Sequence, residues 1–237
     1  SGAFRTNSYW FSHVGKVLQA VPQFLRIRHL FRPLFKVLGR LEAFLSISTF
    51  MEEKSNSPAP WCFPTFKEST TPYIQLNDYS HPLIPASTSI LNSLTLGDNG
   101  HQGMVVTGPN ASGKSMNIRS IILSITLAQS LGIAPARSAV ITPMSKILTY
   151  LNPVDNIAEG RSLFQAEEDR IKYIVQTVES LPHDQLAFIA ADELLSSTAP
   201  QEGEAATFGI CYGLAQHSNC MPIIATHFVK LTALPQD

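Results

Sequence analysis

The chain has 237 residues, of which 44% are hydrophobic and 15% charged, and its net charge at pH 7 is -1. This composition excludes a disordered chain and is sufficient for one α/β domain with its own core and an appended segment. The cysteines Cys62, Cys211 and Cys220 form no CxxC pair, which favours the reducing cytoplasm over a disulfide framework. Because every apolar stretch is broken well short of a bilayer span, we expect a soluble chain without membrane contact.

The basic residues are concentrated near the start of the chain. Residues 1–40 hold seven basic and no acidic residues, whereas the rest of the chain holds ten basic and eighteen acidic ones. Such a basic arm either binds nucleic acid or an acidic partner surface, or is an amphipathic helix whose Arg and Lys side chains face water. The acidic remainder is a poor non-specific DNA binder, because such binding requires clustered cations. The charge pattern leaves both interpretations of residues 1–40 open.

The first part of the chain is expected to be helical. Residues 8–30 have a helical pattern with an interruption at Pro22. Pro33 is suited to the first turn of a second helix, because its missing N–H needs no partner there. Apolar residues at helical spacing then extend this second helix to about Glu53.

A Ser- and Pro-rich stretch at 55–64 marks a boundary, which predicts a helical segment at 1–60 and a second domain at 61–237. Short apolar runs at 74–96 indicate small strands and turns. Strands then alternate with helices, which is typical of a mostly parallel sheet flanked by helices. The expected strands are 104–107, 138–142, 147–151, 186–191 and 222–226, and the expected helices follow residue 115 and lie at about 164–180 and 204–216.

A glycine-rich motif follows the strand expected at 104–107. Its sequence, GPNASGKS, matches G-x-x-x-x-G-K-[ST], in which the glycines let backbone N–H groups approach phosphates. The next helix directs its positive N-terminal end to the same anion. We expect Lys114 to reach the β- and γ-phosphates of ATP and the Ser115 hydroxyl to coordinate Mg²⁺. The expected nucleotide-binding residues are Gly108, Pro109, Asn110, Ala111, Ser112, Gly113, Lys114, Ser115 and Met116.

Two later strands end in residues suited to phosphate hydrolysis. The strand at 186–191 is followed by Asp192 and Glu193, at the edge where open α/β sheets bind ligands. Asp192 is expected to support Mg²⁺ directly or through water, and Glu193 to polarise the attacking water. The strand at 222–226 is followed by His227, which is expected to contact the γ-phosphate. The order of these residues behind a phosphate-binding loop is what favours catalytic roles for Glu193 and His227.

These three motifs occur in the order found in ABC-type ATPases, and each resembles its counterpart in the MutS family. TGPNASGKS at 107–115 is similar to the family's TGPN-x-x-GKS, and NIAEGRSLFQAE at 156–167 to its G-R-S-T-F stretch followed by an acidic residue. The segment at 192–203 resembles D-E-I-x-x-G-T-x-x-x-[DE]-G, and the segment at 225–228 resembles A-T-H-[FY]. HPLI at 81–84, followed by Asn-x-Leu, resembles the entry to the family's ATPase domain.

The resemblance extends from about residue 33 to 231 and implies a P-loop NTPase of the ABC-ATPase type that hydrolyses ATP with Mg²⁺. In the MutS family the G-R-S stretch serves the nucleotide bound by the opposite subunit. The resemblance therefore implies that Ser162, with Gly160 and Arg161, reaches the γ-phosphate in a partner. The implied partners are ATP, a second copy or a related MutS-like subunit, and DNA held by other domains of the parent protein.

Two residues depart from the family pattern, since Leu163 stands where Thr is usual and Ser197 where Gly is usual. No segment resembles a mismatch-reading Phe-x-Glu motif, so the DNA structure that the parent protein recognises stays open. Two other function classes are considered. A different ABC-type machine is disfavoured because no L-S-G-G-Q signature is present, and a non-hydrolysing binding module is disfavoured because the motif residues are retained.

Overall fold

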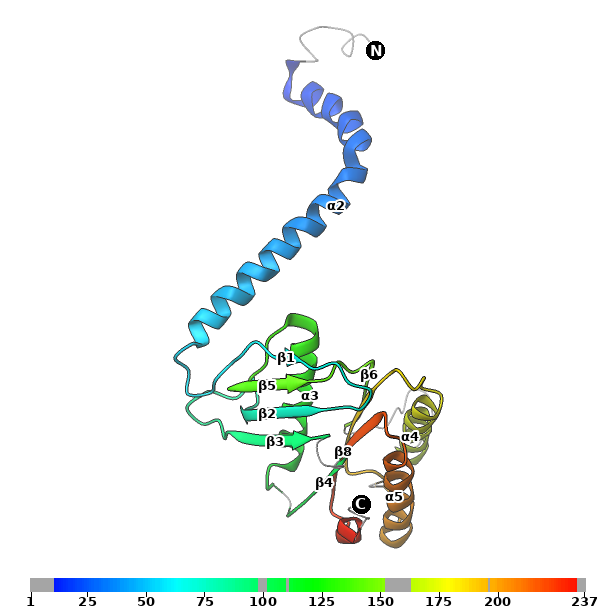
Figure 1. Ribbon diagram of the computed structural model, residues 1–237. Coiled ribbons are helices and arrows are strands. Elements are labelled where there is room, and N and C mark those ends of the chain that lie inside the picture. The colour runs from blue at the N-terminus through cyan, green and yellow to red at the C-terminus, as the bar shows by residue number, and fades with distance from the viewer. Residues whose placement is uncertain (1–10, 98–101, 110, 152–162, 196, 234–237) are drawn as a thin grey trace. The chain divides into compact units, whose positions relative to one another are not determined.

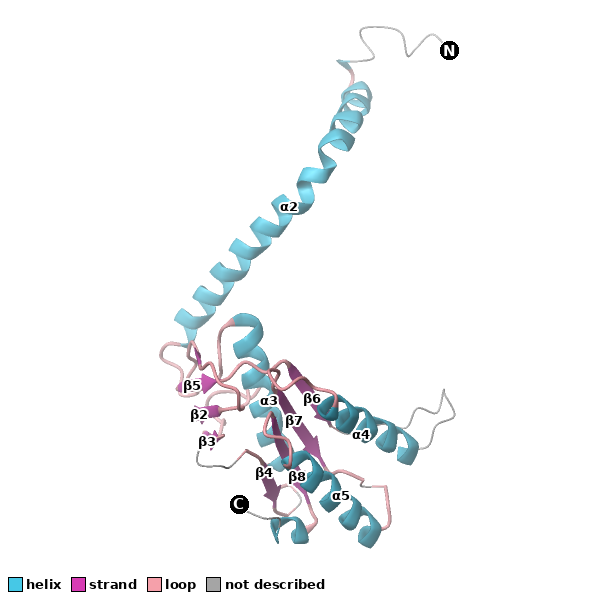
Figure 2. Ribbon diagram, turned by 45° about the vertical axis from the view of Figure 1, so that its right-hand side comes forward, coloured by secondary structure: helices cyan, strands magenta, loops and turns pink. Residues whose placement is uncertain are grey.

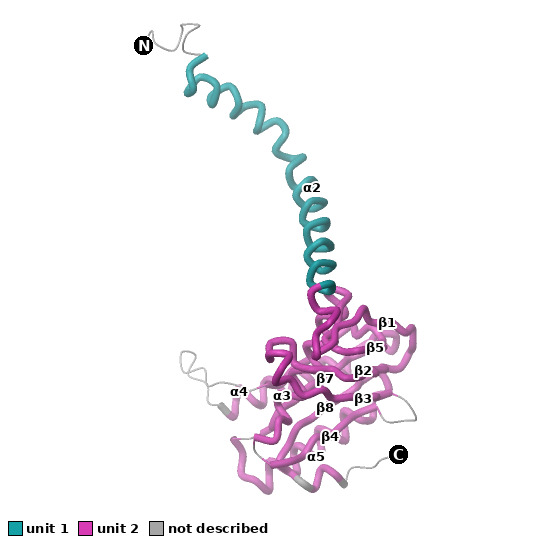
Figure 3. Tube along the Cα trace, turned by 90° about the vertical axis from the view of Figure 1, so that its left-hand side faces the viewer, with its two compact units in different colours: residues 1–52 teal, residues 53–237 magenta. Residues whose placement is uncertain are grey.

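The chain divides into two compact units, Ser1–Glu52 and Glu53–Asp237, which Figure 3 shows in different colours. The second unit combines helices and strands, which confirms the predicted α/β class. The domain boundary expected at residue 60 stays a prediction, because a compact backbone segment is not by itself an independently folding domain. The computed structural model describes residues 11–97, 102–109, 111–151, 163–195 and 197–233.

The first unit is built on one long helix, α2, which runs from His13 to Lys54. Pro22 and Pro33 both lie inside this helix, so the predicted interruption at Pro22 and the predicted new helix at Pro33 are wrong. A proline removes one N–H donor and bends the helix axis, but the hydrogen bonds on either side of it persist. Figure 1 shows α2 as a bent but continuous ribbon. Of the helices that the structure describes, none is both long and apolar enough to cross a membrane.

The second unit contains two four-stranded sheets. The first sheet has the order β1-β5-β2-β3, and its β2 runs antiparallel to both neighbours. The second has the order β4-β8-β7-β6, and all its strands are parallel. The strands are β1 (Thr65–Phe66), β2 (Ile74–Tyr79), β3 (Asn92–Leu96), β4 (Met104–Thr107), β5 (Ser138–Ile141), β6 (Lys146–Tyr150), β7 (Ala187–Asp192) and β8 (Cys220–Thr226).

The mostly parallel sheet predicted from the sequence describes only the second of these sheets. Parallel neighbours need a crossover long enough to hold a helix, whereas antiparallel strands can be joined directly. The connection from β2 to β3 contains turns and no helix, so these two strands pair antiparallel. The strands of the second sheet are separated in the chain by helices and pair parallel.

Helices separate and cover the two sheets (Figure 2). α3 (Lys114–Leu131) contacts β2 of the first sheet as well as β7 and β8 of the second. α4 (Leu163–Glu179) and α5 (Pro200–Ala215) contact each other and cover the opposite face of the parallel sheet. A short 3-10 helix, η3 (Val229–Ala233), follows β8. The unit is therefore layered as mixed sheet, α3, parallel sheet, and the α4–α5 pair.

β7 forms the centre of the core, and all six of its residues are buried. Phe188 and Ala190 belong to the apolar cluster that includes α3, whereas Ile189 and Ala191 belong to the cluster that includes α4 and α5. Successive side chains of a strand point to opposite faces, so a strand covered on both sides is apolar throughout. This burial fixes the direction of β7 and thereby the position of the carboxylates at its end.

Candidate functional site

The candidate site lies along the carboxyl edge of the parallel sheet. β8 pairs with β4 on one side and with β7 on the other. Because the three strands are parallel, the segments that follow them leave the sheet at the same edge. The glycine-rich loop (residues 108–115) after β4, His227 after β8, and Asp192 and Glu193 at the end of β7 are therefore brought to adjacent positions on this edge.

The glycine-rich loop is closed by its own lysine. The Lys114 side chain is buried, and its Nζ donates to the carbonyl oxygens of Gly108 at 2.7 Å and Pro109 at 3.0 Å. Gly113, directly before α3, has a φ of 93°, a conformation that side chains other than glycine rarely adopt. The ammonium group and the N-terminal end of α3 are consequently held together at this loop, which is an arrangement suited to binding an anion.

Asp192 presents a buried carboxylate oxygen at the end of β7. The residue is 5% exposed, and among the residues that the structure describes no donor lies within hydrogen-bond reach of its Oδ1. A buried carboxylate is costly unless it is compensated, so this oxygen fits a cation ligand. In the described part of the chain no three His, Cys, Asp or Glu residues cluster as metal ligands. A cation here would take its other ligands from the Ser115 hydroxyl in the first turn of α3, from water and from phosphate oxygens.

Glu193 and His227 form a pair across the ends of β7 and β8. The His227 Nε2 and the Glu193 Oε1 are 2.5 Å apart, and the two side chains are 41% and 43% exposed. The backbone N–H of Glu193 donates to the Ala225 carbonyl at 2.9 Å, which ties the start of the turn after β7 to β8. The pair is therefore accessible to solvent, and its backbone is anchored to the central strands of the sheet.

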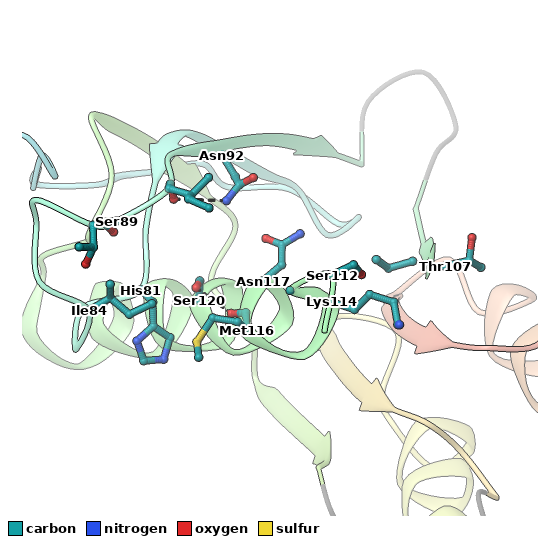
Figure 4. Close-up of a pocket in the computed structure, with 14 residues that line it drawn as sticks. His81, Ile84, Ser89, Asn92, Thr107, Ser112, Lys114, Met116, Asn117 and Ser120 are labelled. Atoms are coloured by element: carbon teal, nitrogen blue, oxygen red, sulfur yellow. Dashed lines mark hydrogen bonds between the residues drawn. The ribbon is translucent and has the colours of Figure 1, made fainter. Parts of the chain in front are cut away.

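A pocket of about 330 Å³ lies between α3 and the segment that connects β2 with β3. Met116, Asn117 and Ser120 line it from α3, and Asn92 lies across from the helix at the start of β3 (Figure 4). Ser112 and Lys114 of the glycine-rich loop are also part of its wall, so the pocket is continuous with the loop. The remaining lining residues are His81, Ile84, Thr88, Ser89, Ile90, Val106, Thr107 and Gly113.

Two polar side chains of this pocket are oriented by their neighbours. Burial raises the pKa of Tyr79 to about 12, so its hydroxyl stays protonated and donates to the Asn117 Oδ1 at 2.5 Å. The Asn117 amide is thereby fixed with its Nδ2 donor directed away from Tyr79. Burial, and then the charge of Arg119, lower the pKa of His81, so this imidazole is neutral at pH 7. The Leu83 N–H donates to the His81 Nδ1 at 3.3 Å, which leaves the proton on Nε2.

The structure brings together most of the predicted site residues. Gly108, Pro109, Ala111, Ser112 and Gly113 form the loop, and Met116 lies in the first turn of α3 and lines the pocket. Asn110, Gly160, Arg161 and Ser162 lie outside the described residues.

The pocket that adjoins the loop was not predicted from the sequence. Part of its wall comes from residues 81–92, for which the only signals were the HPLI and Asn-x-Leu resemblances, and another part from Asn117. Asn117 follows Lys114 at a spacing of three residues, which places both on the same side of α3. That helical spacing is the signal that would have identified it.

Comparisons with known proteins identify what the chain resembles. Residues 104–237 match the family model of MutS domain V, and this range contains the glycine-rich loop, Asp192, Glu193 and His227. The chain is also 29% identical, over 204 residues, to DNA mismatch repair protein MutS 1 of Haloarcula marismortui. The alignment covers 85% of this chain and 21% of that relative, so the chain spans about a fifth of the length of the curated relative it matches.

Proposed function

The chain belongs to the MutS family, and from that premise we propose that it is the ATP-binding and ATP-hydrolysing domain of a MutS-like DNA mismatch repair protein. The observation that carries the proposal is the edge of the parallel sheet, where Lys114, Asp192, Glu193 and His227 converge. Proteins of this family are ATPases in general, and we assign the P-loop NTPase architecture of the ABC type to this domain.

The triphosphate binds at the glycine-rich loop. Lys114 already lies against the loop, and its ammonium exchanges two carbonyl acceptors, of Gly108 and Pro109, for phosphate oxygens. Hydrogen bonds between charged groups are shorter and stronger than those to neutral carbonyls, so the exchange favours the nucleotide. Backbone N–H groups of the loop and the N-terminus of the 18-residue helix α3 supply further donors.

The adenosine part of ATP occupies the pocket beside the loop. The volume of about 330 Å³ is at the lower end of the range for small-molecule sites, about 300–1,000 Å³. Ile90 and Met116 offer apolar surface for the face of a purine ring, and Asn92 and Asn117 offer amide groups for its edge or for the ribose. Continuity between this pocket and Lys114 is the feature that supports one ligand filling both.

Asp192 and Ser115 hold Mg²⁺ in this proposal. The support is the unpartnered, buried Oδ1 of Asp192 and the position of Ser115 in the first turn of α3. When bound, Mg²⁺ neutralises part of the charge on the β- and γ-phosphates. The donor set fits this ion, because Mg²⁺ is commonly bound through one or two protein oxygens together with phosphates and water.

Glu193 orients the attacking water and accepts its proton, and His227 hydrogen-bonds the γ-phosphate. Both side chains are about two-fifths exposed, so each can be reached by water and by substrate. Their contact at 2.5 Å keeps the carboxylate at the end of β7 directed toward the neighbouring strand β8. General acid–base catalysis of this kind contributes about 10²–10⁴-fold to a rate.

We extend the proposal to a composite site between two subunits. By resemblance to the family, the stretch with Gly160, Arg161 and Ser162 reaches the nucleotide of a second copy or of a related MutS-like subunit. The triphosphate then acts as part of the interface, and its hydrolysis loosens the contact. The parent protein would hold DNA through its other domains and respond to this change.

Lys114→Ala tests the nucleotide site. We expect the variant to lose at least tenfold in Mg-ATP affinity by calorimetry, equivalent to about 1.4 kcal/mol, because the triphosphate loses a cation and a directed donor. Lys146→Ala is the matched control, since Lys146 is an exposed lysine at the start of β6 and away from the loop. Equal affinities for the parent and Lys114→Ala would refute the assignment. ATP binding without release of phosphate would instead favour a non-hydrolysing binding module.

A further inference from the structure

The turn that carries Glu193 has an unusual backbone. Glu193 has a φ of 57° and Leu195 a φ of 55°, in the left-handed region that residues other than glycine rarely adopt. Such conformations persist only where the surrounding structure holds them, and they are concentrated at functional sites. The turn is therefore expected to need external contacts to keep the Glu193 carboxylate in place.

Part of this support comes from α5. The Thr207 hydroxyl donates to the carbonyl oxygen of Leu194 at 3.4 Å. Gly203 lies against the turn so closely that a Cβ at this position would be 3.3 Å from the Leu195 carbonyl oxygen. These contacts hold the apolar side of the turn, where Leu194 and Leu195 are buried.

The other support comes from α4, through a buried carboxylate. Glu167 is 0% exposed, and the Ser197 hydroxyl of the turn donates to its Oε2. Tyr150, at the end of β6, lies beside the same carboxylate, and burial followed by the charge of Glu167 raises the pKa of this tyrosine. A buried carboxylate is retained only where donors compensate it, so the contact with Ser197 anchors an exposed turn to the protein interior.

We infer that Glu167 and Ser197 are positioning residues for ATP hydrolysis, which hold the strained turn so that Glu193 meets His227 and the attacking water. This inference rests on the proposed function. Ser197 stands where the family pattern has Gly, and its hydroxyl provides a tether that glycine cannot supply. Neither residue contacts the nucleotide in this assignment, so both act through Glu193.

Ser197→Ala removes the tether without changing the buried core, because Ser197 is exposed. We expect single-turnover hydrolysis to slow at least fivefold, while the dissociation constant for Mg-ATP stays within twofold of that of the parent. Ser197→Thr keeps the hydroxyl and is expected to retain the parent rate. Ser180→Ala is the control, since the Ser180 hydroxyl donates to the Gln176 carbonyl at 2.7 Å at the far end of α4.

Two further measurements separate positioning from general loosening of the fold. In a Glu193→Gln background, Ser197→Ala is expected to slow hydrolysis no further, because effects that act through the same group are not additive. The NMR resonances of the His227 ring, assigned with His227→Gln, are expected to shift in Ser197→Ala and not in Ser180→Ala. A full additional fivefold loss in the double variant would overturn the inference.

The NMR measurement also distinguishes this inference from the proposed function. Unchanged His227 resonances in Ser197→Ala overturn the positioning contact whether or not the parent hydrolyses ATP. The opposite combination is also informative. If the parent binds ATP without hydrolysing it, and the His227 resonances still shift in Ser197→Ala, the proposed hydrolysis is wrong but the link from Ser197 to the Glu193–His227 pair is retained.

Discussion

Glu193→Gln removes one negative charge from the candidate site and leaves its geometry in place. The glutamine side chain has nearly the same shape, and its amide can still form a hydrogen bond with the His227 Nε2, now 2.5 Å from the Glu193 Oε1. The hydrogen bond from the backbone N–H of residue 193 to the Ala225 carbonyl is unaffected by the substitution. We therefore expect the folded structure and the nucleotide pocket to be preserved.

The expected loss is confined to the chemical step. A neutral amide neither accepts the proton of the attacking water nor holds that water by charge, so we expect hydrolysis to slow at least tenfold, which is about 1.4 kcal/mol of activation free energy. Loss of a general base commonly costs about 10²–10⁴-fold, so tenfold is a lower bound. Binding of Mg-ATP is expected to be unchanged or tighter, because a carboxylate near the phosphates repels them.

The assay is single-turnover hydrolysis at saturating enzyme, with calorimetry for binding. Glu179→Gln is the matched control, because it makes the same charge change at an exposed glutamate, the last residue of α4. If Glu193→Gln hydrolyses ATP as fast as the parent, the base is another residue and the role given to Glu193 is wrong. A parallel loss in Glu179→Gln would attribute the effect to overall charge.

Three further predictions concern the proposed metal ligand, the shared site and the core. Asp192→Asn is expected to weaken the dependence of ATP affinity on Mg²⁺, measured with and without chelator. It is also expected to raise the melting temperature of the nucleotide-free protein, because the negative charge of a buried carboxylate is removed. The Ser162→Ala and Lys114→Ala proteins are each expected to be inactive alone and to regain some ATPase activity when mixed, because a mixed dimer keeps one intact shared site. If the two proteins associate and remain inactive, the shared site is contradicted. Phe188→Ala is expected to lower the free energy of unfolding by about 3–5 kcal/mol in denaturant titrations, because this fully buried ring packs against α3.

The elements that the sequence predicts best are those whose burial is apparent in the residues themselves. The stretch LAFIAA is apolar on successive positions, which indicates a strand covered on both faces, and it contains most of β7. The strand 104–107 and the strand ends at Asp192 and His227 were identified in the same way. The alternation of strands and helices predicted parallel strands, whose carboxyl ends lie at one edge of the sheet. It therefore also predicted that Asp192 and His227 lie near the glycine-rich loop.

Two kinds of feature were not predictable from the sequence: the continuity of a helix through proline, and contacts between distant segments. α2 continues through Pro22 and Pro33, because the hydrogen bonds on both sides of each proline maintain the helix. The sequence predicted small strands and turns at 74–96 and one mostly parallel sheet, but it did not predict that β2 and β3 pair antiparallel in a separate sheet. The contact of Glu167 with Ser197 joins positions 30 residues apart, and no local pattern indicates it.

In the proposed function, two of the charged groups of the ATP site, Lys114 and Glu193, are already partnered within the chain before the nucleotide binds. Lys114 is held by two carbonyls of its own loop, and Glu193 is held by His227. Binding of the triphosphate therefore exchanges existing contacts, and Lys114 needs little reorganisation to make the new ones. A γ-phosphate that engages His227 competes with Glu193 for the same Nε2, and it thereby frees the carboxylate for water at the moment when the substrate is in place. Hydrolysis followed by release of phosphate would remove this competitor, and the Glu193–His227 pair would then re-form.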